Sequence, residues 1–474
     1  MPDKFTNMLR RKLTVDWACE KGELDLSYHM LGIGGIHSMP PPKAVVEATA
    51  ALKPKMVRIF LQEYFYIYKG NGVFDWSKLD AYMEGVHAMG GSIMASICIK
   101  PKALFPVLDE RTYMPNNVKE WQDVIRALVL RYTKEKPYVS HWSVGNEMDQ
   151  ETGGGCPYYM ETPEEFFEYY KITAQPIIEA LPDVMVGGMS CCRGGPEGLA
   201  KYISRVITLC KENGVKIDFA CFNGYSDEPS HHVASGRTVR NAIDKIDPSV
   251  KLYMTELNAS LLGHSDVSLE ESAYNPRRAA SLAATLLDFN DDGCLDGSFQ
   301  YHIYDQMNDM TDFENFYEYS RMMAEHWNDL PHRLGLMDLD GKVKPQYYLY
   351  KMIYSLSGKR AGLCGTDKVL RGLASKNCDG NLSVFLTNFT LRGTPDAVSQ
   401  FFFKETPAGF YRMNVYRIDE NTSAQMKSAC ACKHAFDMPL TESRIVYAPG
   451  DFHFDVYTPA DSVTLVQFLK IERP

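Results

Sequence analysis

The chain has 474 residues, of which 45% are apolar and 12% aromatic, and its formal net charge is −10. This apolar content excludes a disordered chain, because there is ample apolar surface to bury. The acidic balance argues against a general nucleic-acid binder, which would present a basic face. The length suits one large domain of roughly 250–350 residues and a smaller second one.

The N-terminal segment is polar and contains Arg10 and Arg11, with no apolar run after it, so a secretory signal is not expected. No apolar stretch reaches the length of about 18 residues that a membrane helix needs. The twelve cysteines follow no disulfide spacing. We therefore expect a cytoplasmic protein with reduced thiols, in which the four glycosylation sequons carry no glycan. The sequons begin at Asn258, Asn381, Asn388 and Asn421.

Short apolar runs alternate with longer amphipathic segments over the first three quarters of the chain. The runs are almost continuously apolar, which is typical of strands buried on both faces. We expect strands at residues 30–36, 56–61, 92–98, 139–145, 184–190, 217–223, 251–257 and 298–304. The helix-type segments include residues 75–90, 116–135, 163–181, 196–212 and 271–290.

Eight strands that each lead into a helical segment predict an α/β fold, the (β/α)8 TIM barrel. The alternative is an open doubly wound sheet, which needs a glycine-rich turn between an early strand and its helix. Residues 32–35 are the one candidate for that turn, and prolines follow them in place of a further glycine. The barrel is therefore the favoured fold.

After about residue 355 the pattern changes to short β-type runs separated by turn-forming residues. These runs lie at residues 383–389, 399–403, 410–418, 444–447, 452–457 and 463–469. They predict an accessory antiparallel β-sandwich. Residues 12–17 precede the barrel and are expected to pair into this sandwich. We place the barrel at residues 29–355 and the sandwich at residues 1–28 plus 356–474.

Two glutamates stand where apolar runs stop. Glu147 ends the fourth run and Glu256 ends the seventh, 109 residues later. In a TIM barrel the active site lies at the C-terminal ends of the strands, and these two strands face each other across the barrel. Each glutamate alone could be a surface or capping carboxylate. As a pair on these two strands, they match the needs of glycoside hydrolysis, in which one carboxyl group protonates the leaving oxygen and the other attacks the anomeric carbon or activates water.

Further motifs make the sequence resemble a known enzyme family. Asn-Glu after strand four and Glu after strand seven resemble the clan A glycoside hydrolases, and other segments are similar to family 39, which includes β-xylosidases and α-L-iduronidases. These segments are Phe74-Asp75-Trp76 with Leu79-Asp80, then Lys100-Pro101-Lys102-Ala103-Leu104, then Tyr253 to Ser260, and Gly335-Leu336-Met337 with Gly341 to Tyr347. The likeness covers most of residues 30–355.

The resemblance implies a retaining double displacement, with Glu147 as general acid/base and Glu256 as nucleophile. It also implies no cofactor. Three positions depart from the family pattern: Leu257 replaces a tryptophan, Asn223 a histidine and Tyr301 a tryptophan. The last two positions line the sugar subsite in the family, so they put the identity of the sugar in doubt.

Six other residues are candidates for substrate binding. Asn146 can bond a sugar hydroxyl beside the reacting carbon. Arg58 could hold Glu256 in its ionised form or form a surface salt bridge. Tyr225 could donate a hydrogen bond to Glu256 or only pack at the barrel mouth. The complete set is Asn146, Arg58, Asn223, Tyr225, Tyr301 and Asp305.

Weaker signals leave alternatives open. Cys430, Cys432 and His434 look like half of a metal site, but no second pair matches them, so no metal is predicted. Cys191 and Cys192 are expected to be inert thiols. The aromatic residues Tyr64, Phe65, Tyr66 and Tyr68 could stack on sugars or form a loop core. The segment 304–327 is long enough to shape a substrate pocket.

The favoured function is a glycosidase that removes a β-linked sugar from an oligosaccharide or glycoside, with β-xylosidase as the default. Other specificities on the same carboxylates are β-glucosidase, β-galactosidase and α-L-arabinofuranosidase. A different class is a carbohydrate-binding barrel without catalysis. A uronic acid substrate would need a cation at the pocket, for which Lys100, Lys102 and Arg58 are candidates. No nucleic-acid or membrane partner is expected, and a homo-oligomer is left open.

Overall fold

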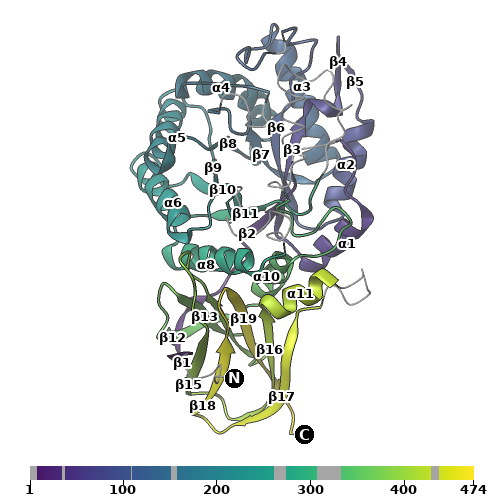
Figure 1. Ribbon diagram of the computed structural model, residues 1–474. Helices are drawn as coiled ribbons and strands as arrows, with labels where there is room; N and C mark the ends of the chain where they lie inside the picture. The colour runs from purple at the N-terminus through teal and green to yellow at the C-terminus, as the bar shows by residue number, and fades with distance from the viewer. Residues whose placement is uncertain are drawn as a thin grey trace.

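The computed structural model describes residues 8–34, 38–107, 109–150, 157–260, 274–306, 333–428 and 437–473. A closed barrel of parallel strands stands beside a second, nine-stranded sheet (Figure 1). The barrel strands are β2 (His29–Gly32), β3 (Met56–Gln62), β6 (Ser92–Cys98), β7 (Val139–Val144), β8 (Met185–Cys191), β9 (Phe219–Tyr225), β10 (Lys251–Asn258) and β11 (Gly297–Tyr301). The barrel closes where β11 pairs with β2, which excludes the open doubly wound sheet.

Helices surround the barrel. They are α1 (Lys43–Leu52), α2 (Ser77–His87), α3 (Val118–Leu130), α4 (Pro163–Ala180), α5 (Gly195–Glu212), α6 (Pro229–Asp244), α8 (Pro276–Asp292) and α10 (Pro345–Tyr354). The start of α4 shows how a capping motif in the sequence marks the beginning of a helix. Thr162 accepts a hydrogen bond from the backbone N–H of Glu165, whose carboxylate accepts one from the N–H of Thr162, so both orphan donors are satisfied. Shorter elements lie in the connections: η1 (Glu63–Phe65) and the hairpin of β4 (Tyr68–Gly70) and β5 (Val73–Phe74) between β3 and α2, and the π-helical turn η2 (Arg131–Glu135) between α3 and β7.

The expected strands match the barrel closely, and the largest differences are at the first and last strands. β2 ends at Gly32 rather than at residue 36, and β11 ends at Tyr301 rather than at residue 304. Beyond β11 the backbone bonds elsewhere: the N–H of Ile303 donates to Gly32, and the N–H of Met337 donates to Ile303. Residues after Tyr301 are therefore held by Gly32 at the end of β2 and by the segment before α10.

The second sheet takes strands from both ends of the chain. Its strands are β1 (Leu9–Glu23), β12 (Lys359–Cys364), β13 (Leu370–Lys376), β14 (Leu382–Asn388), β15 (Ala397–Lys404), β16 (Gly409–Ile418), β17 (Leu440–Ala448), β18 (Phe452–Thr458) and β19 (Ser462–Ile471). The order is β17-β16-β19-β14-β13-β12-β1-β15-β18. The expected pairing of the N-terminal segment is confirmed, because β1 lies between β12 and β15. It runs parallel to β15, so the sheet is mostly rather than wholly antiparallel.

The expected sandwich is one continuous sheet that folds over onto itself. Phe403 on β15 lies 5.4 Å from Phe468 on β19, although four strands separate them in the sheet order. At the two edges, the guanidinium of Arg444 on β17 lies 5.9 Å from the ring of Phe454 on β18. An apolar core fills the space between the halves. The short helix α11 (Glu420–Ser428) was not expected, because its sequence is polar.

Helices α8 and α10 lie between the barrel and the second sheet (Figure 1). The apolar core of the barrel continues across this boundary to Leu373, Phe385 and Leu465. Because the two parts share this core, the division into a barrel at residues 29–355 and an accessory domain stays a prediction.

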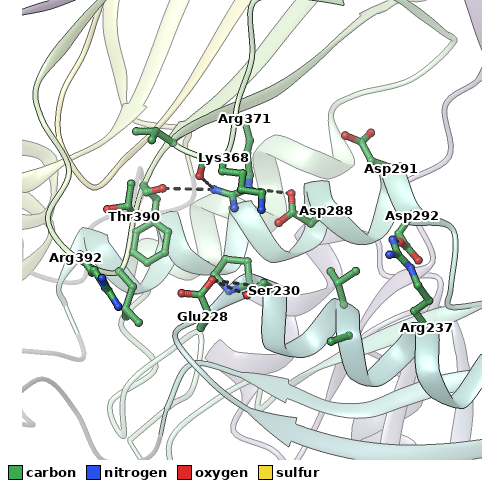
Figure 2. Close-up of a pocket in the computed structure, with 16 residues that line it drawn as sticks. Glu228, Ser230, Arg237, Asp288, Asp291, Asp292, Lys368, Arg371, Thr390 and Arg392 are labelled. Carbon is green, nitrogen blue, oxygen red and sulfur yellow. Dashed lines mark hydrogen bonds and ion pairs between the residues drawn. The ribbon is translucent and has the colours of Figure 1, made fainter. Parts of the chain in front are cut away.

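A cleft of about 720 Å³ opens at the same boundary, between helices α6 and α8 and the end of the second sheet (Figure 2). The helix side contributes four acidic residues and one basic residue, Arg237, which pairs with Asp292, and the sheet side contributes three basic residues. The Nε atom of Arg371 donates to Asp288 across the cleft at 2.8 Å. The two walls thus carry complementary charge, which favours docking of the sheet on the barrel. These charged residues are Glu228, Asp288, Asp291 and Asp292 on one side, and Lys368, Arg371 and Arg392 on the other.

Arg277, near the start of α8, provides a direct test of this docking. Its guanidinium bonds Asp461 at 2.7 Å and the carbonyl of Leu391 at 2.7 Å, and its side chain is 15% exposed. We expect Arg277→Ala to lower the free energy of unfolding by about 1–3 kcal/mol, because Asp461 and that carbonyl lose a partly buried partner. Chemical denaturation measures the change.

The matched control is Arg126→Ala, because Arg126 pairs with Glu179 on an exposed surface. This change should cost less than about 1 kcal/mol. An equally small cost for Arg277→Ala would contradict the docking role of Arg277.

Candidate active site

Four strands bring polar side chains together, three of them at or near their C-terminal ends and β3 from its third residue. Arg58 comes from β3, Asn146 and Glu147 follow β7, and Asn223 and Glu256 lie on β9 and β10. Four of these five residues are almost completely buried, and Glu147 is partly exposed. Because parallel strands present their C-terminal ends on one face, residues distant in sequence meet there.

The guanidinium of Arg58 lies at the centre of this group. Nη1 donates to a carboxylate oxygen of Glu256 at 3.0 Å, and Nη2 donates to the side-chain oxygen of Asn146 at 2.6 Å. Further bonds reach the carbonyl of Thr255 and the hydroxyl of Ser190. The side chain of Arg58 is 1% exposed and that of Glu256 is 5% exposed. Arg58 therefore forms a buried ion pair, which excludes the surface salt bridge considered from sequence.

Glu256 has a second donor on its other oxygen. The hydroxyl of Tyr225 donates to it at 2.5 Å. Burial and the negative charge of Glu256 raise the pKa of the Tyr225 hydroxyl well above its usual range, so Tyr225 keeps its proton. Charge-assisted hydrogen bonds from a guanidinium and a phenol stabilise the ionised form of a carboxylate. Both expected partners of Glu256 are therefore in place.

Glu147 has a different environment. Its oxygen accepts a hydrogen bond from the amide of Asn223 at 2.8 Å, and the same amide donates to Asn146 at 3.2 Å. Burial raises the pKa of the Glu147 carboxyl well above its usual range, and the negative charge of Glu256 raises it further. Glu147 is thus favoured in its protonated form, while Glu256 is held by a cation.

Two residues that sequence reasoning missed complete the network. The hydroxyl of Thr255 donates to the side-chain oxygen of Asn223 at 2.8 Å, which orients the amide towards Glu147. It also bonds the hydroxyl of Ser190 at 3.1 Å. The register of β8 is irregular near Ser190, which lies in the left-handed region with φ 45°. The signal was the glycine pair in β8, since glycine inside a strand marks a bulge or a close approach. A Cβ atom at Gly187 would lie 2.0 Å from the carbonyl oxygen of Phe219.

The last two residues predicted to bind substrate, Tyr301 and Asp305, lie in different surroundings. Tyr301 packs edge-on against Tyr225, with ring centroids 6.1 Å apart, and therefore lies beside the network. Asp305 is engaged elsewhere: one oxygen accepts from Lys344 at 2.6 Å and the other from the N–H of Gly335 at 2.8 Å. No hydrogen bond among the described residues joins Asp305 to the Arg58 network. The physical reason is the early end of β11, which leaves Asp305 beyond the strand.

Two of the three candidate cations for an acidic substrate, Arg58 and Lys100, are committed to other groups, and Lys102 is exposed. Lys100 is 1% exposed and donates to the carbonyls of Asp109 and Pro157. Its ammonium lies 4.7 Å from the ring centroid of Tyr158. The backbone N–H of Lys100 also bonds Glu63, whose pKa burial raises to about 8. Lys100 thus ties loops together around the barrel mouth.

The aromatic residues after β3 mostly form a loop core. Tyr64, Phe65 and Tyr68 are at most 5% exposed, and Phe65 packs against Tyr82 at 5.2 Å. Tyr66 is partly exposed. Cys191 is buried, and burial raises its pKa, as expected for an inert thiol. Residues 430–434 and the loop 307–327 lie outside the described residues.

The described part of the chain contains no cluster of three or more histidine, cysteine, aspartate or glutamate side chains placed to hold a metal ion. None of its helices is long and apolar enough to cross a membrane.

Comparison with known proteins decides the family. Residues 54–379 match the sequence model of the glycosyl hydrolases family 39. The chain belongs to glycosyl hydrolase family 39. A curated β-xylosidase from Caldicellulosiruptor saccharolyticus is 24% identical over 273 residues, which cover 54% of this chain and 50% of the relative. The chain therefore spans about half the length of this curated relative.

Solved structures share the whole fold at low identity. The family 39 enzyme of Xanthomonas axonopodis pv. citri has a TM-score of 0.76 at 17% identity, and the match covers 99% of this chain and 100% of that one. A β-xylosidase of Caulobacter crescentus CB15, described as monomeric, has a TM-score of 0.72 at 17% identity, with coverages of 97% and 100%. A bacterial orthologue of human α-L-iduronidase also has a TM-score of 0.72, at 14% identity, with coverages of 98% and 84%.

The environment of Glu147 predicts a pH-dependent stability that needs no substrate. A carboxyl group whose pKa is raised on folding contributes stability that is complete below its unfolded pKa and is lost as the pH rises through its folded pKa. Glu147→Gln keeps the shape and cannot ionise. Its stability relative to the parent should therefore rise with pH, by up to about 1.4 kcal/mol for each pH unit between the two pKa values.

Denaturation midpoints from about pH 4 to 9 span this change, with the exposed Glu161→Gln as the control. A Glu147→Gln difference that stays constant over this range would contradict the raised pKa of Glu147.

Proposed function

We propose that this family 39 protein is a retaining glycoside hydrolase that removes β-linked xylose from glycosides or oligosaccharides. The observation that carries the proposal is the unequal pair of carboxyl groups. Glu256 accepts from Arg58 and Tyr225, whereas Glu147 meets a neutral amide in a buried setting that favours its protonated form. A retaining glycosidase needs one carboxyl group ionised and the other protonated.

In the first step, Glu147 gives its proton to the glycosidic oxygen while Glu256 attacks the anomeric carbon from the opposite face. The leaving group departs as an alcohol, and a covalent glycosyl ester forms on Glu256. The ester carries no charge. The repulsion that favoured protonated Glu147 is therefore gone, and Glu147 remains ionised after it has given up its proton.

In the second step, Glu147 takes a proton from water, and the resulting hydroxyl group adds to the anomeric carbon. The bond to Glu256 breaks, and the sugar leaves with the configuration of the substrate retained. The amide of Asn223 keeps Glu147 in place through both steps, since it can donate to either form of the carboxyl group.

The choice of xylose rests on the relatives, and two features of the site support a neutral sugar. Arg58 is committed to Glu256 and Asn146, and Lys100 to backbone carbonyls. Neither of these two cations is placed to bind a uronic acid carboxylate. Glucosidase, galactosidase and arabinofuranosidase activities use the same chemistry, and a panel of nitrophenyl glycosides ranks them. Release from none of them would favour a binding protein without catalysis.

Chemical rescue tests the two roles separately on a nitrophenyl β-xyloside. Glu256→Ala should abolish turnover, and azide should restore release of nitrophenol with an inverted α-glycosyl azide as product, because azide enters from the face of the missing nucleophile. Glu147→Ala should slow turnover by about 10²–10⁴-fold. Azide should then give the retained β-glycosyl azide, because it attacks the glycosyl-enzyme without needing a base.

Glu161→Ala, which removes an exposed carboxylate, should leave the rate unchanged. Near-normal activity of Glu256→Ala without azide would rule out Glu256 as the nucleophile. NMR of the azide product reports the configuration directly.

A further inference from the structure

Asp149 lies two residues after Glu147, in the turn that follows β7. This turn has an unusual backbone: Gly145 has φ 75° and Glu147 has φ 48°, both in the left-handed region. For a glutamate this conformation costs free energy and persists only where surrounding contacts impose it. The position of the acid/base therefore depends on what holds the turn.

Two connections fasten the turn to the end of β8. The backbone N–H of Glu147 donates to the carbonyl of Ser190 at 3.1 Å. The carboxylate of Asp149 accepts from the backbone N–H groups of Cys192 at 3.1 Å and Arg193 at 2.9 Å. The segment that carries Glu147 is thus bridged at two points, one at the end of β8 and one on the chain between β8 and α5.

Asp149 also acts on Glu147 through its charge. Burial raises the pKa of Asp149, while the two N–H donors favour its ionised form. The negative charge of Asp149 adds to the effects of burial and of Glu256 in raising the pKa of Glu147. The other groups that face Glu147 and Asp149 are Arg58 from β3, Asn223 from β9, Cys191 and Cys192 at the end of β8, and Arg193 and Tyr202 from the following turn and α5.

We propose that Asp149 is a positioning residue for the reaction, which fixes the Glu147 segment against β8 and whose negative charge favours the protonated acid. This inference rests on the proposed function and adds to it a residue outside the carboxylate pair. A purely structural role would need only the hydrogen bonds. The charge makes a separate contribution that can be measured.

Asp149→Asn separates the two contributions. The amide oxygen can still accept from Cys192 and Arg193, so the variant should fold, and its kcat at the pH optimum should stay within about threefold of the parent. With one negative charge removed, Glu147 loses its proton at lower pH. The alkaline limb of the pH profile of kcat/KM should therefore move down by about 0.5–1 pH unit. An unchanged limb would overturn the electrostatic part of the proposal.

Asp149→Ala removes the hydrogen bonds as well. We expect kcat to fall by about tenfold or more with little change in KM, because the misplaced acid affects the chemistry and not the binding. Unchanged kcat would overturn the positioning part. The control is Asp183→Asn, an exposed carboxylate just before β8, which should change neither quantity.

A second measurement does not depend on turnover. The pH dependence of the stability difference between Glu147→Gln and its parent can be recorded twice, once with Asp149 intact and once with Asp149→Asn in both proteins. The charge effect predicts that the difference stops growing at a lower pH, and at a smaller value, once Asp149 is replaced, and a coincident pair of curves contradicts it. If the wild-type chain cleaves no glycoside while the two curves differ, the proposed function fails and the influence of Asp149 on Glu147 stands.

Discussion

The buried guanidinium of Arg58 connects its own strand to the ends of three others, and the rest of the site is arranged around it. Burying a cation is costly unless it is paired and its N–H groups are bonded. Here the pairing falls on Glu256, and Asn146, Ser190 and the carbonyl of Thr255 take further bonds. Because Asn146 faces Arg58 with its oxygen, it accepts from Asn223 on the same atom. The amide of Asn223 is thereby directed to Glu147.

This order of contacts explains why two glutamates in one site behave differently. The cation and the Tyr225 hydroxyl stand on the Glu256 side, and the Glu147 side has a neutral amide, a buried surface and the further negative charge of Asp149. The asymmetry is therefore built by groups that themselves do not react. The barrel supplies the rigid frame, and the irregular register of β8 brings Ser190 within reach of both Arg58 and Thr255.

The sequence was most informative where burial alone decides the structure. Strands buried on both faces read as continuous apolar runs, so their ends, and with them Glu147 and Glu256, could be located. Hydrogen-bond partners were harder, because they depend on register. Ser190 became a partner only through the irregular register of β8, and Asp305 lay beyond the strand because the backbone after Tyr301 bonds to residues 336–337. The single folded sheet was also not predictable, since the order in which strands distant in sequence pair leaves no local pattern.

The proposed mechanism requires Glu256 to form a covalent bond to the sugar. An aryl 2-deoxy-2-fluoro-β-xyloside tests it directly, because the fluorine slows both steps through the electron-poor transition state while the good leaving group lets the first step proceed. Peptide mass spectrometry after inactivation should find one fluoroxylosyl group on the peptide that contains Glu256, and Glu256→Gln should remain unlabelled. A label on another residue, or turnover of ordinary xylosides without any trapped ester, would contradict the account.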